Sequence, residues 1–195
     1  PAMTGQAAGT RMKTVLKLMA PYLAVAIFWC AFQNAWLAIL AYHAQILLWS
    51  RARLKICLRG PNGRWLVAMA VPCALAGPLV YGLLPIMTPG AGLAAWLARF
   101  GLQGPALVLM IPYFGIVHPL LEQAHWSALR SMGWPAHLAF AGYHMLVLHS
   151  LLAPAWLAVC FAVLLAASAV WRRAESREGS GPRAACAGHV LADLG

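Results

Sequence analysis

Charged residues are scarce in this 195-residue sequence, and acidic residues are the scarcest of all. Only 9% of the residues are charged and only four are acidic, while 63% are hydrophobic. An ordinary soluble domain carries roughly 25% charged residues, so this chain lacks the polar groups that a globular surface needs. The composition therefore excludes a soluble globular domain and predicts a protein embedded in a membrane.

Two common metal-binding patterns are also missing. No Cys-x-x-Cys pair occurs among the five cysteines, which are Cys30, Cys57, Cys73, Cys160 and Cys186. At least three of them fall within apolar runs, so we expect buried thiols rather than a disulfide or zinc framework. The sequence also contains no His-Glu-x-x-His, the usual signature of a helical zinc protease.

Apolar runs long enough to cross a bilayer recur along the chain and predict an all-α, polytopic transmembrane bundle of about six spans. A helix needs about 20 apolar residues to cross a hydrocarbon core ~30 Å thick. The first run, 18–49, is longer than this but too short for two complete crossings, so we expect one tilted or broken helix. The other expected spans are 65–87, 105–122, 135–152, 154–171 and one that begins near residue 184.

Basic residues predict the orientation of these spans. Segment 51–64 holds the densest basic tract, and the positive-inside rule assigns it to the cytoplasm. The formal net charge of +10 does not indicate nucleic-acid binding, because the basic residues lie in short tracts that flank apolar runs. We therefore expect a multi-pass protein of a bacterial-type plasma membrane, in contact with the lipid bilayer and with no nucleic-acid partner.

Two of the four acidic residues are candidates for chemistry inside the membrane. Glu175 and Glu178 fall in segment 172–183, whose composition is that of a flexible solvated linker, so we expect both to be exposed. Glu122 and Asp193 lie instead near the ends of apolar runs, where an ionisable group costs ~2.5–3.5 kcal/mol to insert and is a functional candidate. The alternative is that both merely lie in the headgroup region.

Histidines join these carboxylates on three different expected spans. His118, Glu122 and His125 are spaced four and three residues apart, so they would share one face of a continuous helix. His144 and His189 lie on two other spans, at a similar depth from the expected cytoplasmic side. Polar groups that reach one depth from three helices can converge on one cavity.

Three short sequences, each on its own expected span, carry a family pattern. They read H-P-L-L-E-Q-A-H-W at 118–126, F-A-G-Y-H at 140–144 and H-V-L-A-D at 189–193. In order and spacing they resemble the E-E-x-x-x-R, F-x-x-x-H and H-x-x-x-N/D motifs of the CPBP family, the CAAX proteases and bacteriocin-processing (Abi) enzymes. The resemblance divides the chain into an N-terminal tail (1–17), N-terminal helices with the basic loop (18–104) and a core of catalytic type (105–195).

The resemblance implies an intramembrane endopeptidase whose site opens toward the cytoplasm and whose substrate is a peptide or a lipidated protein. Glu122 and His144 would activate the attacking water as general base and orienting partner. His189 and Asp193 would steady the carbonyl oxygen or the water, with Phe140 in support. No cofactor is certain, and a divalent metal such as zinc stays open, because two histidines and one carboxylate would bind zinc only in a suitable geometry.

The first motif departs from the family pattern at two positions. Gln123 stands where the family has its second Glu, and Ser127 stands where it has Arg. The first change removes a negative charge and the second removes the guanidinium that would pair with it, so the two losses compensate electrically. They also fit a catalytically weakened member of the family, in which both residues keep only a supporting role.

Two other functions fit the same sequence. A b-type cytochrome would use histidines between helices as haem ligands, the candidates being His43, His137, His144 and His149. A membrane scaffold or pseudoprotease would have no active site, and the altered first motif agrees with it. A Soret absorption band would identify the cytochrome, whereas a co-purifying partner and tolerance of Glu122 substitution would identify the scaffold.

Overall fold

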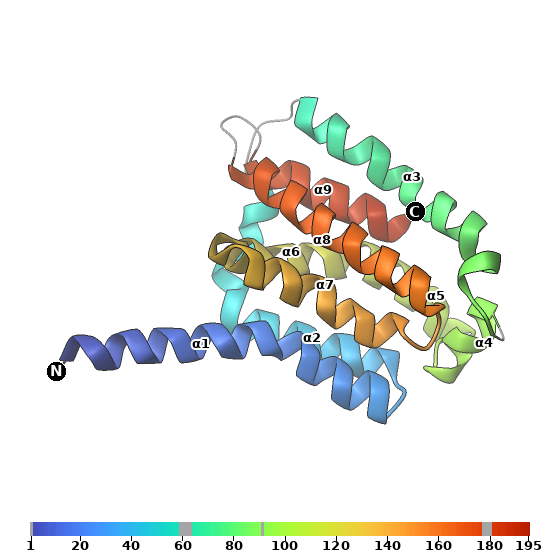
Figure 1. Ribbon diagram of the computed structural model, residues 1–195, viewed down its shortest axis with the longest axis horizontal. Coiled ribbons are helices and arrows are strands. Elements are labelled where there is room, and N and C mark those ends of the chain that lie inside the picture. Colours follow the sequence, from blue (N-terminus) through green and yellow to red (C-terminus); the bar gives the residue numbers. More distant parts are fainter. Residues whose placement is uncertain (1, 59–63, 91, 177–180) are drawn as a thin grey trace.

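Helices make up all the regular structure of the computed structural model, which describes residues 2–58, 64–90, 92–176 and 181–195 (Figure 1). The elements are α1 (Ala2–Ala24), η1 (Val25–Ala31), α2 (Ala35–Ser50), η2 (Arg51–Leu58), α3 (Arg64–Met87), α4 (Gly92–Arg99), α5 (Pro105–Pro112), η3 (Tyr113–Val117), α6 (His118–Leu129), η4 (Arg130–Met132), α7 (Trp134–Leu148), α8 (Pro154–Ser176) and α9 (Gly181–Leu194). The all-α expectation is confirmed for these ranges.

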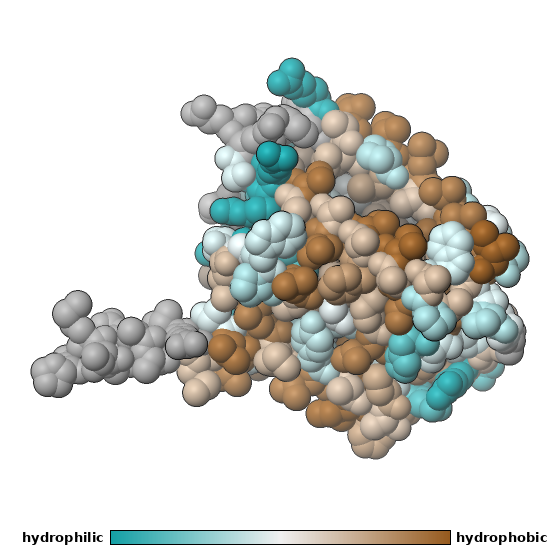
Figure 2. Space-filling model, viewed as in Figure 1, coloured by the Kyte–Doolittle hydropathy of each residue, from teal (hydrophilic) through white to brown (hydrophobic). Residues whose placement is uncertain are grey.

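Four helical stretches in the described residues are long and apolar enough to cross a membrane. They are Met12–Ala31, Leu66–Met87, Pro105–Met132 and Pro154–Ser176. Their outer surfaces are apolar, as lipid contact requires: Leu75, Leu79 and Tyr81 of α3 are 62%, 63% and 74% exposed. Figure 2 shows hydrophobic residues all along the edge that α3 forms. The chain is therefore an integral membrane protein by composition and fold, although the expected number of about six spans is not confirmed.

The apolar run 18–49 forms a helical hairpin, so the expectation of one tilted or broken helix was wrong. Helix α1 and the π-helical turn η1 end at Ala31, and α2 returns beside them (Figure 1). Gln33 has φ 51°, in the left-handed region, and the Asn34 side chain caps α2 by accepting a hydrogen bond from the Leu37 N–H at 2.9 Å. The length argument failed because α1 begins well before residue 18 and supplies the missing part of a crossing.

The end of α9 docks against α3 and η3 through two glycines. A Cβ at Gly77 of α3 would overlap the backbone of Gly195, and a Cβ at Gly115 of η3 would overlap the Leu194 side chain. Glycine permits this close approach because it has no side chain to displace. Since Asp193 immediately precedes the docked residues, the two glycines determine where its carboxylate lies.

Cys57 and Cys186 form a disulfide between η2 and α9, so the expectation that all five cysteines are thiols was wrong. Their Cα atoms are 5.5 Å apart although 129 residues separate them in sequence. Cys30, Cys73 and Cys160 are free. Disulfides persist in oxidising compartments and are transient or redox-sensing in the cytoplasm. On the cytoplasmic side, where segment 51–64 is expected to lie, this bond would be of the transient or redox-sensing kind.

Removing this disulfide is expected to lower thermal stability. In the double variant Cys57→Ser/Cys186→Ser the melting temperature in detergent should fall by roughly 5–10 °C, because the unfolded chain is no longer cross-linked. Circular dichroism at the helical band measures it. Cys73→Ser, which changes a free thiol, is the matched control and should melt within about 1 °C of the wild type; an unchanged double variant would contradict the cross-link.

Candidate active site

Glu122 is completely buried at the centre of the bundle, and one of its oxygens is held by two tyrosines. Oε1 accepts a hydrogen bond from the Tyr42 hydroxyl of α2 at 3.2 Å and another from the Tyr143 hydroxyl of α7. The Trp126 indole N–H donates to the Tyr42 hydroxyl at 2.9 Å, so the Tyr42 proton is left to point at the carboxylate. Helices α2, α6 and α7 therefore meet at Oε1.

The other carboxylate oxygen, Oε2, faces two imidazoles. His189 Nε2 lies 3.2 Å from it and His118 Nε2 lies 3.5 Å from it. Both are close enough for electrostatic attraction, but neither has the geometry of a hydrogen bond, and Oε2 has no hydrogen-bond partner among the described residues. A buried polar atom without a partner is rare and often belongs to a catalytic group. Oε2 is thus the oxygen of Glu122 that can accept a proton.

Helix α9 adds a second carboxylate next to His189. Asp193 lies one helical turn beyond His189, and its Oδ2 is 3.7 Å from His189 Nε2. Asp193 Oδ2 and His189 Nδ1 are also buried without a hydrogen-bond partner in the part of the chain that the structure describes. Three of the predicted site residues therefore come together, and each keeps a polar atom that is not used for folding.

Phe140 packs the second motif against the other two. It is completely buried, and its ring centroid lies 4.8 Å from His144, 5.5 Å from Trp126 and 6.4 Å from His189. Trp171 of α8 stacks on His189 at 4.4 Å with an interplanar angle of 27°, which restricts rotation of the imidazole. The supporting role expected of Phe140 has a physical basis, because this ring touches residues of all three motifs.

His144 reaches the same region from α7, but no hydrogen bond joins it to Glu122. Its Nδ1 bonds the Phe140 carbonyl at 2.8 Å, and its ring lies 4.0 Å from that of Tyr143. A carbonyl can only accept, so Nδ1 carries the proton and Nε2 is the basic nitrogen of the neutral imidazole. His144 is therefore oriented as a proton acceptor beside the carboxylate.

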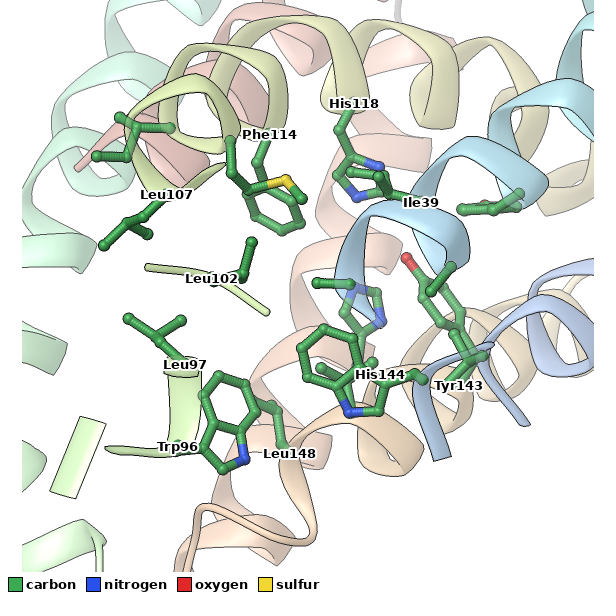
Figure 3. A pocket seen from close by; sticks show the side chains of 18 residues that line it. Ile39, Trp96, Leu97, Leu102, Leu107, Phe114, His118, Tyr143, His144 and Leu148 are labelled. Atoms are coloured by element: carbon green, nitrogen blue, oxygen red, sulfur yellow. The ribbon is translucent and has the colours of Figure 1, made fainter. Parts of the chain in front are cut away.

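An apolar cavity of about 350 Å³ adjoins the carboxylate. Figure 3 shows Leu97 and Leu107 on one side of it and His118 and Tyr143 on the other. Its few polar lining residues are Tyr42, His118, Tyr143 and His144. Since known small-molecule sites have about this size and a mainly apolar lining, the cavity suits an apolar group that ends at the Glu122 cluster.

Gln123, the neighbour of Glu122, belongs to a separate buried cluster. Arg130 donates to Glu175 Oε1 at 2.6 Å and to Gln123 Oε1 at 2.9 Å, and Gln123 Nε2 donates to the same Glu175 oxygen at 2.5 Å. The Arg130 side chain is 0% exposed and that of Glu175 is 5% exposed. The expectation that Glu175 lies in a solvated linker was wrong, because α8 continues to Ser176 and turns this carboxylate inward to neutralise Arg130.

This cluster holds an ion pair next to Gln123. The pair consists of Arg130 and Glu175, neither of which stands at a position of the motif. Arg130 lies two helical turns after Gln123, and its acidic partner comes from α8. Ser127 takes no part in it: its hydroxyl donates to the Ala124 carbonyl of its own helix at 3.4 Å. Sequence reasoning missed the pair because no local spacing links Arg130 to a residue 45 positions away.

The remaining histidines have other partners. His125 Nε2 bonds the Lys17 carbonyl of α1 at 3.1 Å, so it does not join His118 and Glu122 as their spacing suggested. His43, a candidate haem ligand, uses both ring nitrogens in hydrogen bonds, to Tyr113 at 2.8 Å and to His118 at 3.0 Å. Neither nitrogen is therefore left for an iron atom.

Two further haem candidates use one ring nitrogen each: His137 Nδ1 bonds Ser168 at 2.8 Å, and His149 Nδ1 bonds the Leu146 carbonyl at 2.9 Å, which leaves Nε2 of both available. Among the described residues, no group of three or more His, Cys, Asp or Glu side chains is arranged to hold a metal ion.

Comparisons with protein-family models, with curated proteins and with solved structures found no match to this chain.

Breaking the Arg130–Glu175 pair is expected to destabilise the bundle. Glu175→Gln leaves a buried guanidinium without a counter-charge, which costs about 3–5 kcal/mol, so the melting temperature in detergent should drop by roughly 10 °C. The matched control replaces both partners, as Arg130→Met/Glu175→Leu, and should lose much less stability. Equal losses in the single and double variants would show that the charge pairing is not what matters.

Proposed function

We propose that this chain is a membrane-embedded endopeptidase of the CPBP type that hydrolyses peptide bonds with Glu122 as the general base. The observation that carries the proposal is the convergence of Glu122, His189 and Asp193 around the unpartnered Oε2 of Glu122. The resemblance of the three motifs supports it, since residues of all three motifs surround Phe140.

The chemistry follows from the two unlike oxygens of Glu122. Oε1 is held by two hydroxyl donors, so Oε2 is the basic oxygen and takes a proton from the attacking water. The water oxygen bonds to the peptide carbon while the carbonyl becomes an oxyanion. Glu122 then returns the proton to the amide nitrogen as the C–N bond breaks. His189 would stabilise the oxyanion, and His144, whose Nε2 accepts a proton, would orient the water.

The apolar cavity supports a substrate with an apolar group next to the scissile bond, such as a lipidated peptide or an apolar protein segment. Trp29, Trp96 and Phe114 give the cavity aromatic walls, and His118 and His144 form part of its polar side. Apolar binding in such a cavity would place the peptide beside Glu122. The substrate is accordingly expected to reach the site from the lipid.

Basic residues support a topology of about six spans, with α2 and α7 crossing in addition to the four long apolar stretches. Helix α2 takes the place of the span expected from residue 184, because α9 there has only 14 residues. The backbone N–H of Ala35 bonds the Phe100 carbonyl and that of Ala153 bonds the Met87 carbonyl, which joins helix ends on one side. On that side Arg99 is the one basic residue within the described ranges. The positive-inside rule then makes the opposite side, with segment 51–64, cytoplasmic.

Loss of the general base is expected to abolish cleavage. Glu122→Gln keeps the shape of the side chain but cannot accept the proton, so kcat/KM on a membrane-proximal peptide should fall about 10²–10⁴-fold. The kcat/KM of His144→Ala and of His189→Ala should also fall strongly. Mass spectrometry of the products measures the cleavage. His149→Ala, at the exposed residue directly after α7, is the control and should keep full activity.

Two results would overturn the proposal. One is wild-type activity in Glu122→Gln. The other is a wild-type protein that cleaves neither unmodified nor lipidated peptides while Glu122→Gln melts at the same temperature, which would favour a scaffold or pseudoprotease.

Filling the cavity is expected to weaken binding of a lipidated substrate. Ala38→Phe adds a ring to the cavity wall, so KM for a lipidated peptide should rise about tenfold, in line with the loss of apolar burial. KM for the same peptide without the lipid should change less. Leu138→Phe, at an exposed position that does not line the cavity, is the matched control. An equal rise of KM for both peptides would show that the cavity does not bind the lipid.

A further inference from the structure

Three residues at positions that the family motifs do not specify lie in a line that ends at Glu122. They are His118, His43 and Tyr113. His118 Nε2 faces Glu122 Oε2 at 3.5 Å, and His118 Nδ1 lies 3.0 Å from His43 Nε2. His43 Nδ1 in turn lies 2.8 Å from the Tyr113 hydroxyl. Each imidazole therefore uses one nitrogen toward Glu122 and the other toward Tyr113.

The π-helical turn η3 creates this alignment. Its hydrogen bonds run from residue i to residue i+5, so the His118 N–H bonds the Tyr113 carbonyl and the two residues lie one turn apart. His43 of α2 lies against both of them. In a regular α-helix a separation of five residues would turn the two side chains well apart, so the π turn allows one histidine to bridge them.

Burial makes a relay useful at this position. Glu122 and His118 are 0% and 5% exposed, whereas Tyr113 is half-buried and His43 lies between them at 2%. A fully enclosed carboxyl group cannot exchange its proton directly with the medium. In the proposed reaction Glu122 passes the first water proton to the leaving amine, and the second water proton stays on the new carboxyl group. When the product departs as a carboxylate, this second proton is left on Glu122, and the enclosed side chain needs a route to release it before the next cycle.

We propose that His118, His43 and Tyr113 form a proton relay between Glu122 Oε2 and the half-buried Tyr113 hydroxyl. The role of the relay in removing the proton from Glu122 rests on the proposed function, but the order of contacts along these residues does not. The longest step, at 3.5 Å, shortens when the carboxylate rotates toward His118; such bonds often tighten only in a working complex.

Two arrangements of protons satisfy this line with both imidazoles neutral. When Glu122 is ionised, each histidine carries its proton on Nε2: His118 points N–H at the carboxylate, His43 donates to His118, and Tyr113 donates to His43. When Glu122 is protonated, every donor is reversed and each histidine carries its proton on Nδ1.

Conversion of the second arrangement into the first releases one proton. The Glu122 proton moves to His118 Nε2, the His118 Nδ1 proton moves to His43 Nε2, and the His43 Nδ1 proton moves to the Tyr113 oxygen. The proton that Tyr113 carried before then passes to a water molecule at the half-buried Tyr113 hydroxyl. Every residue except Glu122 ends with as many protons as it began with.

The tautomers of His43 and His118 provide a direct test, because the relay couples both to Glu122. The two tyrosine donors at Oε1 require that Glu122→Gln place its amide oxygen there and its NH₂ group toward His118. Nitrogen-15 solid-state NMR in lipid should then show both histidines protonated at Nε2 in the wild type and at Nδ1 in Glu122→Gln. His149, which bonds its own helix, serves as the internal control and should not change.

Two results would overturn the relay. One is that His43 and His118 carry their protons on different nitrogens within the same protein, and the other is that both tautomers are the same in the wild type and in Glu122→Gln. This measurement needs no substrate, so it separates failure of the relay from failure of the proposed peptidase.

A kinetic arm tests the use of the relay. Neither His43 nor Tyr113 lines the cavity, so Tyr113→Phe and His43→Phe should lower kcat about tenfold and leave KM unchanged. Tyr113→Phe removes one half-buried oxygen and is expected to fold even if His43→Phe does not. His149→Phe is the matched control. An unchanged kcat in Tyr113→Phe would overturn the catalytic use of the line.

Discussion

A single buried carboxylate is the constraint on which the centre of this bundle depends. A charge inside a membrane protein is tolerated only where the protein supplies polar partners. The Glu122 carboxylate is contacted by Tyr42 of α2, Tyr143 of α7 and His189 of α9. Four helices therefore have their positions set by one side chain, and the apolar residues pack around that arrangement.

Adjacent positions of α6 serve different purposes. Glu122 and Gln123 are neighbours in sequence, yet successive residues of a helix point about 100° apart. Gln123 consequently faces α8, where its side chain, Arg130 of η4 and Glu175 form a hydrogen-bonded cluster. Among the described residues this cluster leaves two buried atoms without a hydrogen-bond partner, Arg130 Nε and Glu175 Oε2, and the Glu122 cluster leaves three, Glu122 Oε2, His189 Nδ1 and Asp193 Oδ2. Of the two clusters, only the one at Glu122 has surrounding residues that also line the apolar cavity.

Much of the fold could be predicted from hydrophobicity. The apolar runs at 65–87, 105–122 and 154–171 correspond to long helices, because the lipid imposes both their length and their composition. The hairpin within 18–49 could not be predicted, because Gln33 and Asn34 are ordinary polar residues whose turn becomes evident only from the backbone. Run length alone does not distinguish one long helix from two that share residues beyond the run.

The candidate site was predictable where spacing carries information and unpredictable where it does not. Glu122, His189 and Asp193 could be found because two of them lie one turn apart and all belong to sequence motifs. Tyr42 is separated from Glu122 by 80 residues, so no local pattern marks it. Arg130, Glu175 and the Cys57–Cys186 disulfide were missed for the same reason: their partners are neighbours only in three dimensions.

The acidic side chains of the described residues turn inward, so the outward-facing charges of this part of the chain are basic. Glu122 is fully buried, and the Glu175 and Asp193 side chains are 5% and 17% exposed, so none of these three carboxylates faces outward. Arg51, Arg53 and Lys55 are exposed on η2. Within the described residues no outward-facing carboxylate can neutralise them, so their counter-charge is not provided by the described part of the chain. Phosphates of anionic lipids supply it at a membrane surface, and this surface is then expected to hold such lipids around the bundle.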